Sequence, residues 1–175
     1  MDTKSKMTPE AVVLAFLDAF NKNDLDGGMA CLADDFVRLG ESTKWEPMSK
    51  KIYRDMWARF ADAFPDFKWE TSCMVTSGDT VAIEVIETGT FTDPWVWQGK
   101  TLWPTGKAYR SRISLFFRVN KDGLIQDSEE EGTGIASLAR CSVQASKRKS
   151  VFGPGSASCR SYAWERGMKA GHPRR

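Results

Sequence analysis

The pattern of apolar and polar residues divides the chain into a helical first part and a β-rich second part. Apolar residues recur at spacings of three and four over residues 9–20, after a fitting N-cap at Thr8 and with Pro9 at the first helical position. A shorter helix is expected over about 25–33, weakened by two glycines, and a short strand over 36–39. A third helix is predicted from about Ser49 to Phe64, where Pro65 ends it.

The third predicted helix carries a broad aromatic stripe. Its apolar positions lie at spacings of three and four, and they are Ile52, Tyr53, Met56, Trp57, Phe60 and Phe64. Such a stripe usually packs in a core. This one is bulkier than a small domain needs for filling space, so part of it is expected to wall a cavity.

From residue 67 onward the pattern is typical of β-strands, with candidates at 67–76, 80–92, 108–119 and 124–130. Lys121-Asp122-Gly123 is a good hairpin turn between the last two. Helices followed by a meander of strands predict the α+β class. We expect a cone-shaped barrel, in which the N-terminal helices pack in a strongly curved antiparallel sheet around an apolar interior.

The strand over 80–92 carries one carboxylate in an apolar register. Its odd positions (Val81, Ile83, Val85, Glu87, Gly89 and Phe91) are more apolar than its even ones, so they are the expected inner face. A buried carboxylate is costly unless it is paired or protonated. Glu87 is therefore either a glutamate at the mouth of the barrel that still touches water, or an acid inside a pocket.

The last predicted strand is unusually acidic, with carboxylates on both faces at Asp127, Glu129, Glu130 and Glu131. A solvated strand end explains such a run simply. Alternatively, Glu129 or Glu130 points into the cone and faces Glu87, or pairs with Arg110 or Arg112 on the adjacent strand. Two carboxylates that share a dry pocket have separated pKa values, which supplies one acid and one base.

Three tryptophans, Trp95, Trp97 and Trp103, crowd the connection between two of the predicted strands. Exposed aromatic residues on a loop often mark a lid or a partner surface. They are equally compatible with closure over a flat ligand and with packing in a dimer interface.

Charge is unevenly distributed along the 175 residues, although the net charge is only +2. Residues 141–175 carry +7 and are rich in serine and glycine, whereas residues 1–140 carry −5. We therefore predict one domain over 1–140 and a basic, disordered tail over 141–175. The run Lys147-Arg148-Lys149 is a weak nucleic-acid signal, and a solvated tail explains it more simply.

Several classes of protein are disfavoured by composition. The N-terminus has no apolar signal core and no stretch approaches membrane-spanning length, so we expect a soluble, intracellular protein of the cytoplasm. The four cysteines lack metal-binding spacing. The only histidine, His172, lies near the C-terminus, which removes histidine-based triads and metal sites from the body of the protein.

Five short motifs in a fixed order carry a family resemblance. They are Ala63-Phe-Pro-Asp-Phe-Lys-Trp, Gly78-Asp-Thr-Val-Ala, Thr88-Gly-Thr-Phe-Thr, Pro104-Thr-Gly-Lys and Phe117-Arg-Val-Asn-Lys-Asp-Gly. Together with the opening helices they resemble the SnoaL-like polyketide (ester) cyclases, a family of the nuclear transport factor 2-like superfamily of α+β cones. The resemblance covers roughly residues 8–140 and implies the same fold, commonly as a homodimer.

The resemblance also implies a chemistry, the intramolecular aldol closure of a polyketide ester without metal or organic cofactor. It needs a base for a proton beside a carbonyl and a donor for the enolate oxygen. The aspartate that serves as acid and base in the family falls on Glu130. Two family histidines fall on Ser128 and Phe91, which are departures from its pattern.

These observations lead to a hypothesis of cofactor-free proton transfer, next to the carbonyl of a small, largely apolar compound, in aldol cyclisation or isomerisation. Glu130 or Glu129 would act with Glu87 opposite. The expected substrate-contacting residues are Tyr53, Trp57, Phe60, Phe64, Phe91 and Trp103. No metal, membrane or nucleic-acid partner is expected. The alternative is a non-catalytic ligand-binding or dimerisation module of the same fold.

Overall fold

The computed structural model describes residues 7–97 and 99–132. The predicted tail and the end of the predicted domain lie outside these residues. The helices are α1 (Pro9–Asn21), α2 (Leu25–Ala30) and α3 (Lys50–Ala63), with a 3₁₀ turn, η1 (Glu41–Thr43). The strands are β1 (Leu32–Gly40), β2 (Met48–Ser49), β3 (Lys68–Ser77), β4 (Thr80–Thr90), β5 (Trp95–Trp97), β6 (Lys100–Leu102), β7 (Ala108–Val119) and β8 (Ile125–Glu131).

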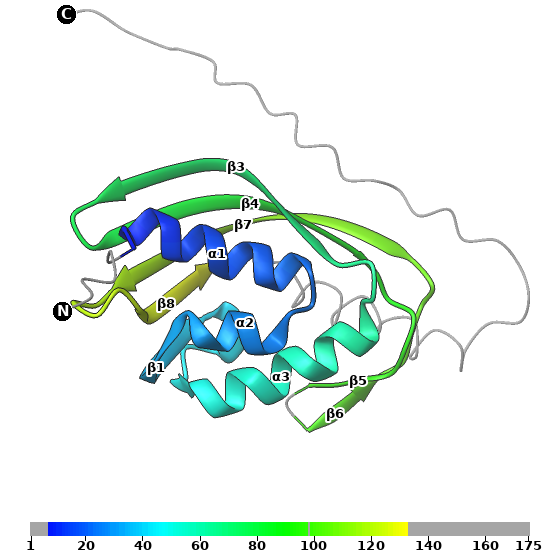
Figure 1. Cartoon of the computed structure of the whole chain (residues 1–175). Coiled ribbons are helices and arrows are strands. Elements are labelled where there is room, and N and C mark those ends of the chain that lie inside the picture. Colours follow the sequence, from blue (N-terminus) through cyan, green and yellow to red (C-terminus); the bar gives the residue numbers. More distant parts are fainter. Residues whose placement is uncertain (1–6, 98, 133–175) are drawn as a thin grey trace, which may run out of the picture.

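Six strands form one curved sheet in the order β2-β1-β8-β7-β4-β3, and β5 and β6 form a separate hairpin. The long strands β3, β4 and β7 arch over the helices (Figure 1). Pairing is antiparallel except between β1 and β8, which run parallel. The prediction of an α+β cone is confirmed, but the wholly antiparallel sheet was wrong. Because β8 returns from the β7 hairpin, its free edge meets β1 running in the same direction.

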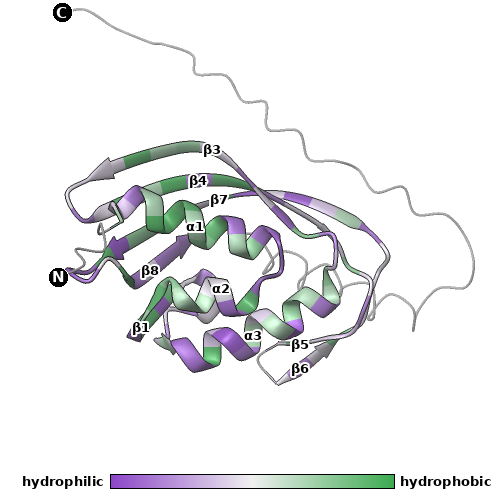
Figure 2. Ribbon diagram, viewed as in Figure 1, coloured by the Kyte–Doolittle hydropathy of each residue, from purple (hydrophilic) through white to green (hydrophobic). Residues whose placement is uncertain are grey.

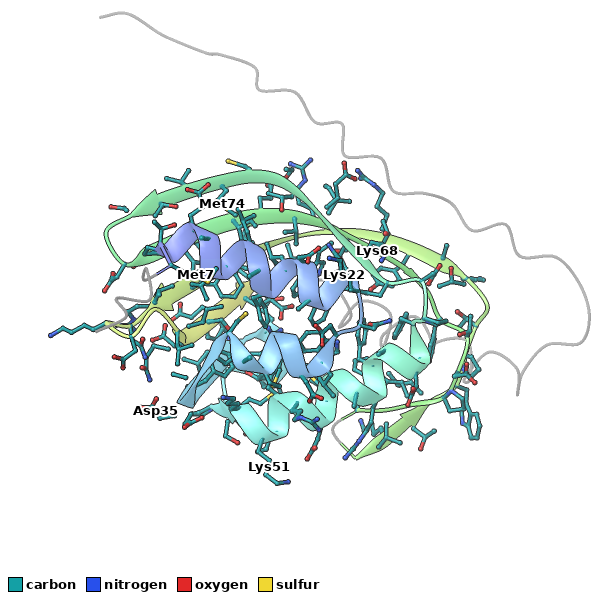
Figure 3. All side chains as sticks on the ribbon, in the orientation of Figure 1. Met7, Lys22, Asp35, Lys51, Lys68 and Met74 are labelled. Carbon is teal, nitrogen blue, oxygen red and sulfur yellow. The ribbon has the colours of Figure 1, made fainter. Side chains whose placement is uncertain are left out.

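The helices pack on the concave face of the sheet, and side chains fill the space between the two layers (Figures 1 and 3). Most of the predicted stripe of α3 faces inward, with Trp57, Phe60 and Phe64 buried as expected, whereas Ile52 is exposed. Hydrophobic and hydrophilic positions alternate along α3 in Figure 2, which shows the amphipathic pattern that orients it. Ser49 caps α3 by accepting a hydrogen bond from the backbone N–H of Ile52.

Helix α2 is shorter than predicted, because the chain is already extended at Leu32. The backbone N–H of Ile125 donates to the carbonyl of Cys31, and Leu32 pairs with Ile125, so β1 begins where the helix was expected to continue. Gly28 has a packing role here. A Cβ at this position would lie 2.4 Å from the indole of Trp57, so the glycine lets α3 pack closely on α2.

Strand β4 has the predicted inner face. Its odd positions from Val81 to Gly89, and Phe91 beyond it, are buried, whereas most even positions are only partly so. The β5–β6 hairpin was not predicted. It packs beside the end of α3, with Trp95 turned into the core (Figure 1).

Candidate functional site

A small, largely enclosed cavity of about 30 Å³ lies between the helices and the sheet. Residues from eight elements reach it, which is why no single stretch of sequence encodes it. The lining residues are Phe20, Arg38, Ser42, Tyr53, Met56, Phe60, Phe67, Trp69, Glu87, Trp95, Trp97 and Glu130. The wall is mostly aromatic and holds two carboxylates and one guanidinium.

Glu87 is the most deeply buried acid of the site, with 2% of its surface exposed. The indole Nε1–H of Trp69 donates to its Oε2 at 3.0 Å, and the hydroxyl of Tyr109 donates to its Oε1 at 3.0 Å. Both partners are neutral. Of the two interpretations of the sequence, the pocket acid is therefore correct and the water-touching glutamate at the barrel mouth is wrong.

Burial raises the pKa of the Glu87 carboxyl, because the ionised form loses its hydration. The hydrogen bonds from Trp69 and Tyr109, and the more distant charge of Arg38, act in the opposite direction. The pKa of Tyr109 is raised by burial and by the adjacent carboxylate, so its phenol stays protonated and keeps donating to Glu87. The arrangement suits a carboxyl group that holds its proton to a higher pH than an exposed glutamate does.

Glu130 lies on the same cavity but in a different environment. Its Oε2 forms an ion pair with the guanidinium of Arg38 on β1, and both side chains are buried. The hydroxyl of Ser42 donates to the same carboxylate oxygen at 3.1 Å and accepts a hydrogen bond from Nη2 of Arg38 at 3.2 Å. Glu130 is thus neutralised by a cation, whereas the hydrogen-bond donors to Glu87 are neutral groups.

Gly40 allows this ion pair to form. It is the register partner of Glu130, while Arg38 is opposite Ser128, so the two charged side chains meet diagonally on the inner face. A Cβ at Gly40 would lie 2.6 Å from the backbone oxygen of Glu130, and its φ of +149° is disfavoured for other residues. The glycine therefore sets the close approach of β1 to β8.

Tyr53 lies against the guanidinium of Arg38 and is also influenced by the charge of Glu87. Its ring centroid is 5.2 Å from Cζ of Arg38, which is within the range of a cation–π contact. Burial raises the pKa of the Tyr53 phenol; Arg38 lowers it and Glu87 raises it further. The phenol therefore stays protonated and remains a possible hydrogen-bond donor to a ligand.

A second, open pocket of about 590 Å³ adjoins the cavity on the side of α3 and the β5–β6 hairpin. Three side chains line both spaces and separate them: Ser42, Met56 and Trp97. On the open side the wall also includes Ile52, whose side chain is exposed, and the charged residues Lys44 and Arg59. The cavity and the outer pocket thus share a wall of three side chains.

The structure brings together only part of the predicted site. Glu87, Glu130, Tyr53 and Phe60 line the cavity. The predicted ion pair of Glu129 or Glu130 with Arg110 or Arg112 was wrong, since Glu130 pairs with Arg38 and Arg112 pairs with Glu84. Five predicted residues do not line the cavity, and they are Glu129, Trp57, Phe64, Phe91 and Trp103.

The predicted residues that do not line the cavity lie on the outer face of the sheet, in the core or on the surface. Glu129 is exposed on the outer face of β8, because the side chains of a strand alternate and Glu130 points inward. Phe91, at the position of a family histidine, stacks on Phe64 in the core with ring centroids 5.0 Å apart. Trp103 is 69% exposed, whereas Trp95 is buried, so the three tryptophans do not form one exposed cluster.

Sequence reasoning missed Arg38, Ser42 and Trp69, and it assigned Trp95 and Trp97 only to a loop. The position of Arg38 could have been found from the sequence, because it lies two residues after Phe36 on a short strand and so shares its buried face. Glu87 shares the apolar face of β4 in the same way. Ser42 and Trp69 carried none, because their roles depend on tertiary contacts with Glu130 and Glu87.

Within residues 7–97 and 99–132, no group of three or more His, Cys, Asp or Glu side chains is placed to hold a metal ion. The described helices include none that is long and apolar enough to cross a membrane.

The class that the structure defines is an α+β cone with helices packed in a curved sheet, and solved structures share this fold. The chain is similar to AclR, a candidate hydroxylase of Streptomyces galilaeus, with 23% identity over 75% of this chain and 93% of that one, at a TM-score of 0.63. IdmH, a candidate polyketide cyclase of Streptomyces antibioticus, gives 23% identity, 77% and 99% coverage and a TM-score of 0.63.

A SnoaL-like polyketide cyclase from Agrobacterium tumefaciens shares 18% identity, with 77% and 98% coverage and a TM-score of 0.60. At these identities the structures support the fold alone. No curated protein sequence matches the chain. The model of the SnoaL-like domain matches residues 13–128, and the chain therefore belongs to the SnoaL-like family of the nuclear transport factor 2-like superfamily.

Proposed function

We propose that this protein is a SnoaL-like enzyme that catalyses proton transfer at the carbon next to a carbonyl group, with Glu87 as the proton carrier. One observation carries the proposal: Glu87 is buried in an aromatic cavity, and its hydrogen-bond donors are neutral. Such a carboxylate can accept a proton, whereas Glu130 is neutralised by Arg38. The step is common to aldol cyclisation and to keto–enol isomerisation.

In the proposed step, the α C–H bond breaks and its proton goes to the carboxylate of Glu87. The electron pair moves into the new C=C bond, and the carbonyl oxygen becomes an enolate oxygen. The guanidinium of Arg38 and the phenol of Tyr53 are the protonated groups of the cavity that can stabilise this oxygen. Return of the proton to another carbon gives isomerisation, whereas attack of the enolate on a second carbonyl gives cyclisation.

The size of the cavity requires a movement. Small-molecule sites typically occupy about 300–1,000 Å³, and the inner cavity holds about 30 Å³ whereas the outer pocket holds about 590 Å³. We propose that most of the substrate occupies the outer pocket. Its carbonyl end would reach Glu87 once Met56 or Trp97 rotates away from the shared wall.

A second candidate is a non-catalytic module that binds a ligand or a second copy of the chain. The observations that favour it are the small volume of the cavity and the satisfied hydrogen bonds of Glu87, which give that residue a structural role. In that case the outer pocket would bind a ligand without any chemistry at Glu87.

Deuterium incorporation distinguishes the two candidates, because it reports α-proton transfer whatever the final product. The full-length protein is incubated in D₂O with a panel of polyketide-like and steroid-like ketones, and exchange at the α carbons is followed by NMR. Loss of a general base typically costs about 10²–10⁴-fold in rate, so Glu87→Gln should lower exchange by at least ~100-fold.

Glu129→Gln is the matched control, because it makes the same change on the exposed face of β8. It should exchange at the wild-type rate. If no ketone exchanges faster than in buffer with the wild-type protein, or if Glu87→Gln exchanges as fast as wild type, the enzyme proposal fails and the binding module takes its place.

A further inference from the structure

Two hydrogen-bond donors of the cavity wall lack partners among the described residues. They are Nε of Arg38 and Nε1 of Trp95, and both are buried side-chain atoms. Arg38 is 6% exposed and Trp95 is 2% exposed. Buried N–H groups in native proteins are nearly always paired, so a pair of unpaired ones calls for an explanation.

Both unpaired donors belong to residues that line the same cavity as Glu87. Neither side chain is free to turn toward another partner. The guanidinium of Arg38 is held by Glu130 and Ser42. The indole of Trp95 is packed among Phe60, Phe64 and Trp97, with ring centroids 5.0–6.0 Å apart. The two N–H groups are therefore fixed in place before any ligand arrives.

We propose that Nε–H of Arg38 and Nε1–H of Trp95 form a binding site for the acceptor oxygens of a ligand, such as a carbonyl or an enolate. A preorganised N–H group in a dry site stabilises a developing oxygen charge more than water does. It also discriminates strongly against a ligand without that oxygen, since the donor then stays unpaired. The site would select compounds that carry an acceptor oxygen at their buried end.

The proposal deepens the proposed function and rests on it only for the assumption that the ligand carries a carbonyl. Its test measures binding rather than turnover, so the two can fail separately. A ketone that binds through Trp95 without deuterium exchange would support the site and refute the enzyme. Deuterium exchange that depends on Glu87 but not on Trp95 would support the enzyme and refute the site.

The probes are cyclopentanone and methylenecyclopentane, which have nearly the same shape but differ in the acceptor oxygen. They are titrated into the ¹⁵N-labelled full-length protein, and the indole N–H signals of its seven tryptophans are recorded. The variant Trp95→Phe assigns the signal of Trp95 and keeps an aromatic ring in its place. Trp69 is an internal control, because its indole N–H already donates to Glu87.

We expect cyclopentanone to shift the Trp95 signal downfield and saturably, with a smaller change at Trp69. Methylenecyclopentane should leave the Trp95 signal unshifted. Trp95→Phe should weaken binding of the ketone about tenfold, the usual effect of losing one hydrogen bond, and leave binding of the hydrocarbon unchanged. The Nε–H signal of Arg38, assigned through Arg38→Lys, should move with the ketone as well.

Three results would overturn the proposal: a Trp95 signal that does not move at saturation with the ketone, one that moves equally with both probes, or a cavity that admits neither probe. Circular dichroism of Trp95→Phe guards against loss of the fold. If that variant is unfolded, the comparison of the two probes on the wild-type protein decides alone.

Discussion

Replacing Arg38 by methionine removes one charge of a buried ion pair and leaves the carboxylate of Glu130 without its cation. Breaking a buried pair in this way typically costs about 3–5 kcal/mol of unfolding free energy, because an uncompensated charge remains in a dry site. Ser42 still donates one hydrogen bond to the carboxylate, which favours the lower end of this range. For a domain of this size, we expect the melting temperature to fall on the order of 10 °C.

The double variant Arg38→Met/Glu130→Leu removes both charges and should recover most of this loss. A double-mutant cycle in urea isolates the coupling between the two residues. Asp18 on α1 and Lys22, the C-cap of that helix, supply a control pair, since their side chains are 60% and 67% exposed, and their coupling should stay near ~0.5 kcal/mol or below. A coupling between Arg38 and Glu130 as small as that of the control pair would refute a tightly packed ion pair.

Two further predictions concern Glu87 and Gly40. Because burial raises the pKa of Glu87 above 4.5, the folded state retains a proton that the unfolded state releases, so stability should fall as the pH rises from 4.5 through the folded pKa. Urea unfolding at a series of pH values should show that the stability of wild type relative to Glu87→Gln falls as the pH rises, and a constant difference between the two would contradict this. Gly40→Ala should lower the melting temperature more than Gly78→Ala does. At Gly78 backbone strain alone accounts for the loss, about 1–3 kcal/mol. A Cβ at Gly40 meets the backbone of Glu130, whereas Gly78, at a φ of +61°, has open space; equal losses would argue against the close approach.

The sequence predicted the framework well because that framework depends on local pattern. The period of α3 and the alternation of β4 each identify a buried face, and both faces were confirmed at Trp57 and Glu87. The turn around Asp122 has the predicted location, with Asn120 and Leu124 closing it through their backbones.

The partners of the acidic residues could not be predicted in the same way. Choosing between Glu129 and Glu130 requires the register of β8, and a one-residue shift exchanges the two faces of a strand. The ion pair of Glu130 depends on the parallel pairing of β8 with β1, and the residues of neither strand indicate that pairing. The assignment of Trp95 to a loop failed because its hairpin has strands of only three residues each, too short for a period to emerge.

The parallel pairing of β1 with β8 also determines when the sheet and the cavity can form during folding. Ser42 and Glu130 are 88 residues apart in sequence, so the two halves of the site meet only when nearly all of the domain is available. Closing so long a loop is slow because its entropy is lost before any contact forms. During synthesis on the ribosome, β1 cannot pair with β8, and Arg38 cannot bind Glu130, until the last strand has emerged. A nascent chain that stops short of β8 would expose an unpaired strand edge, the kind of surface that chaperones recognise and aggregation exploits.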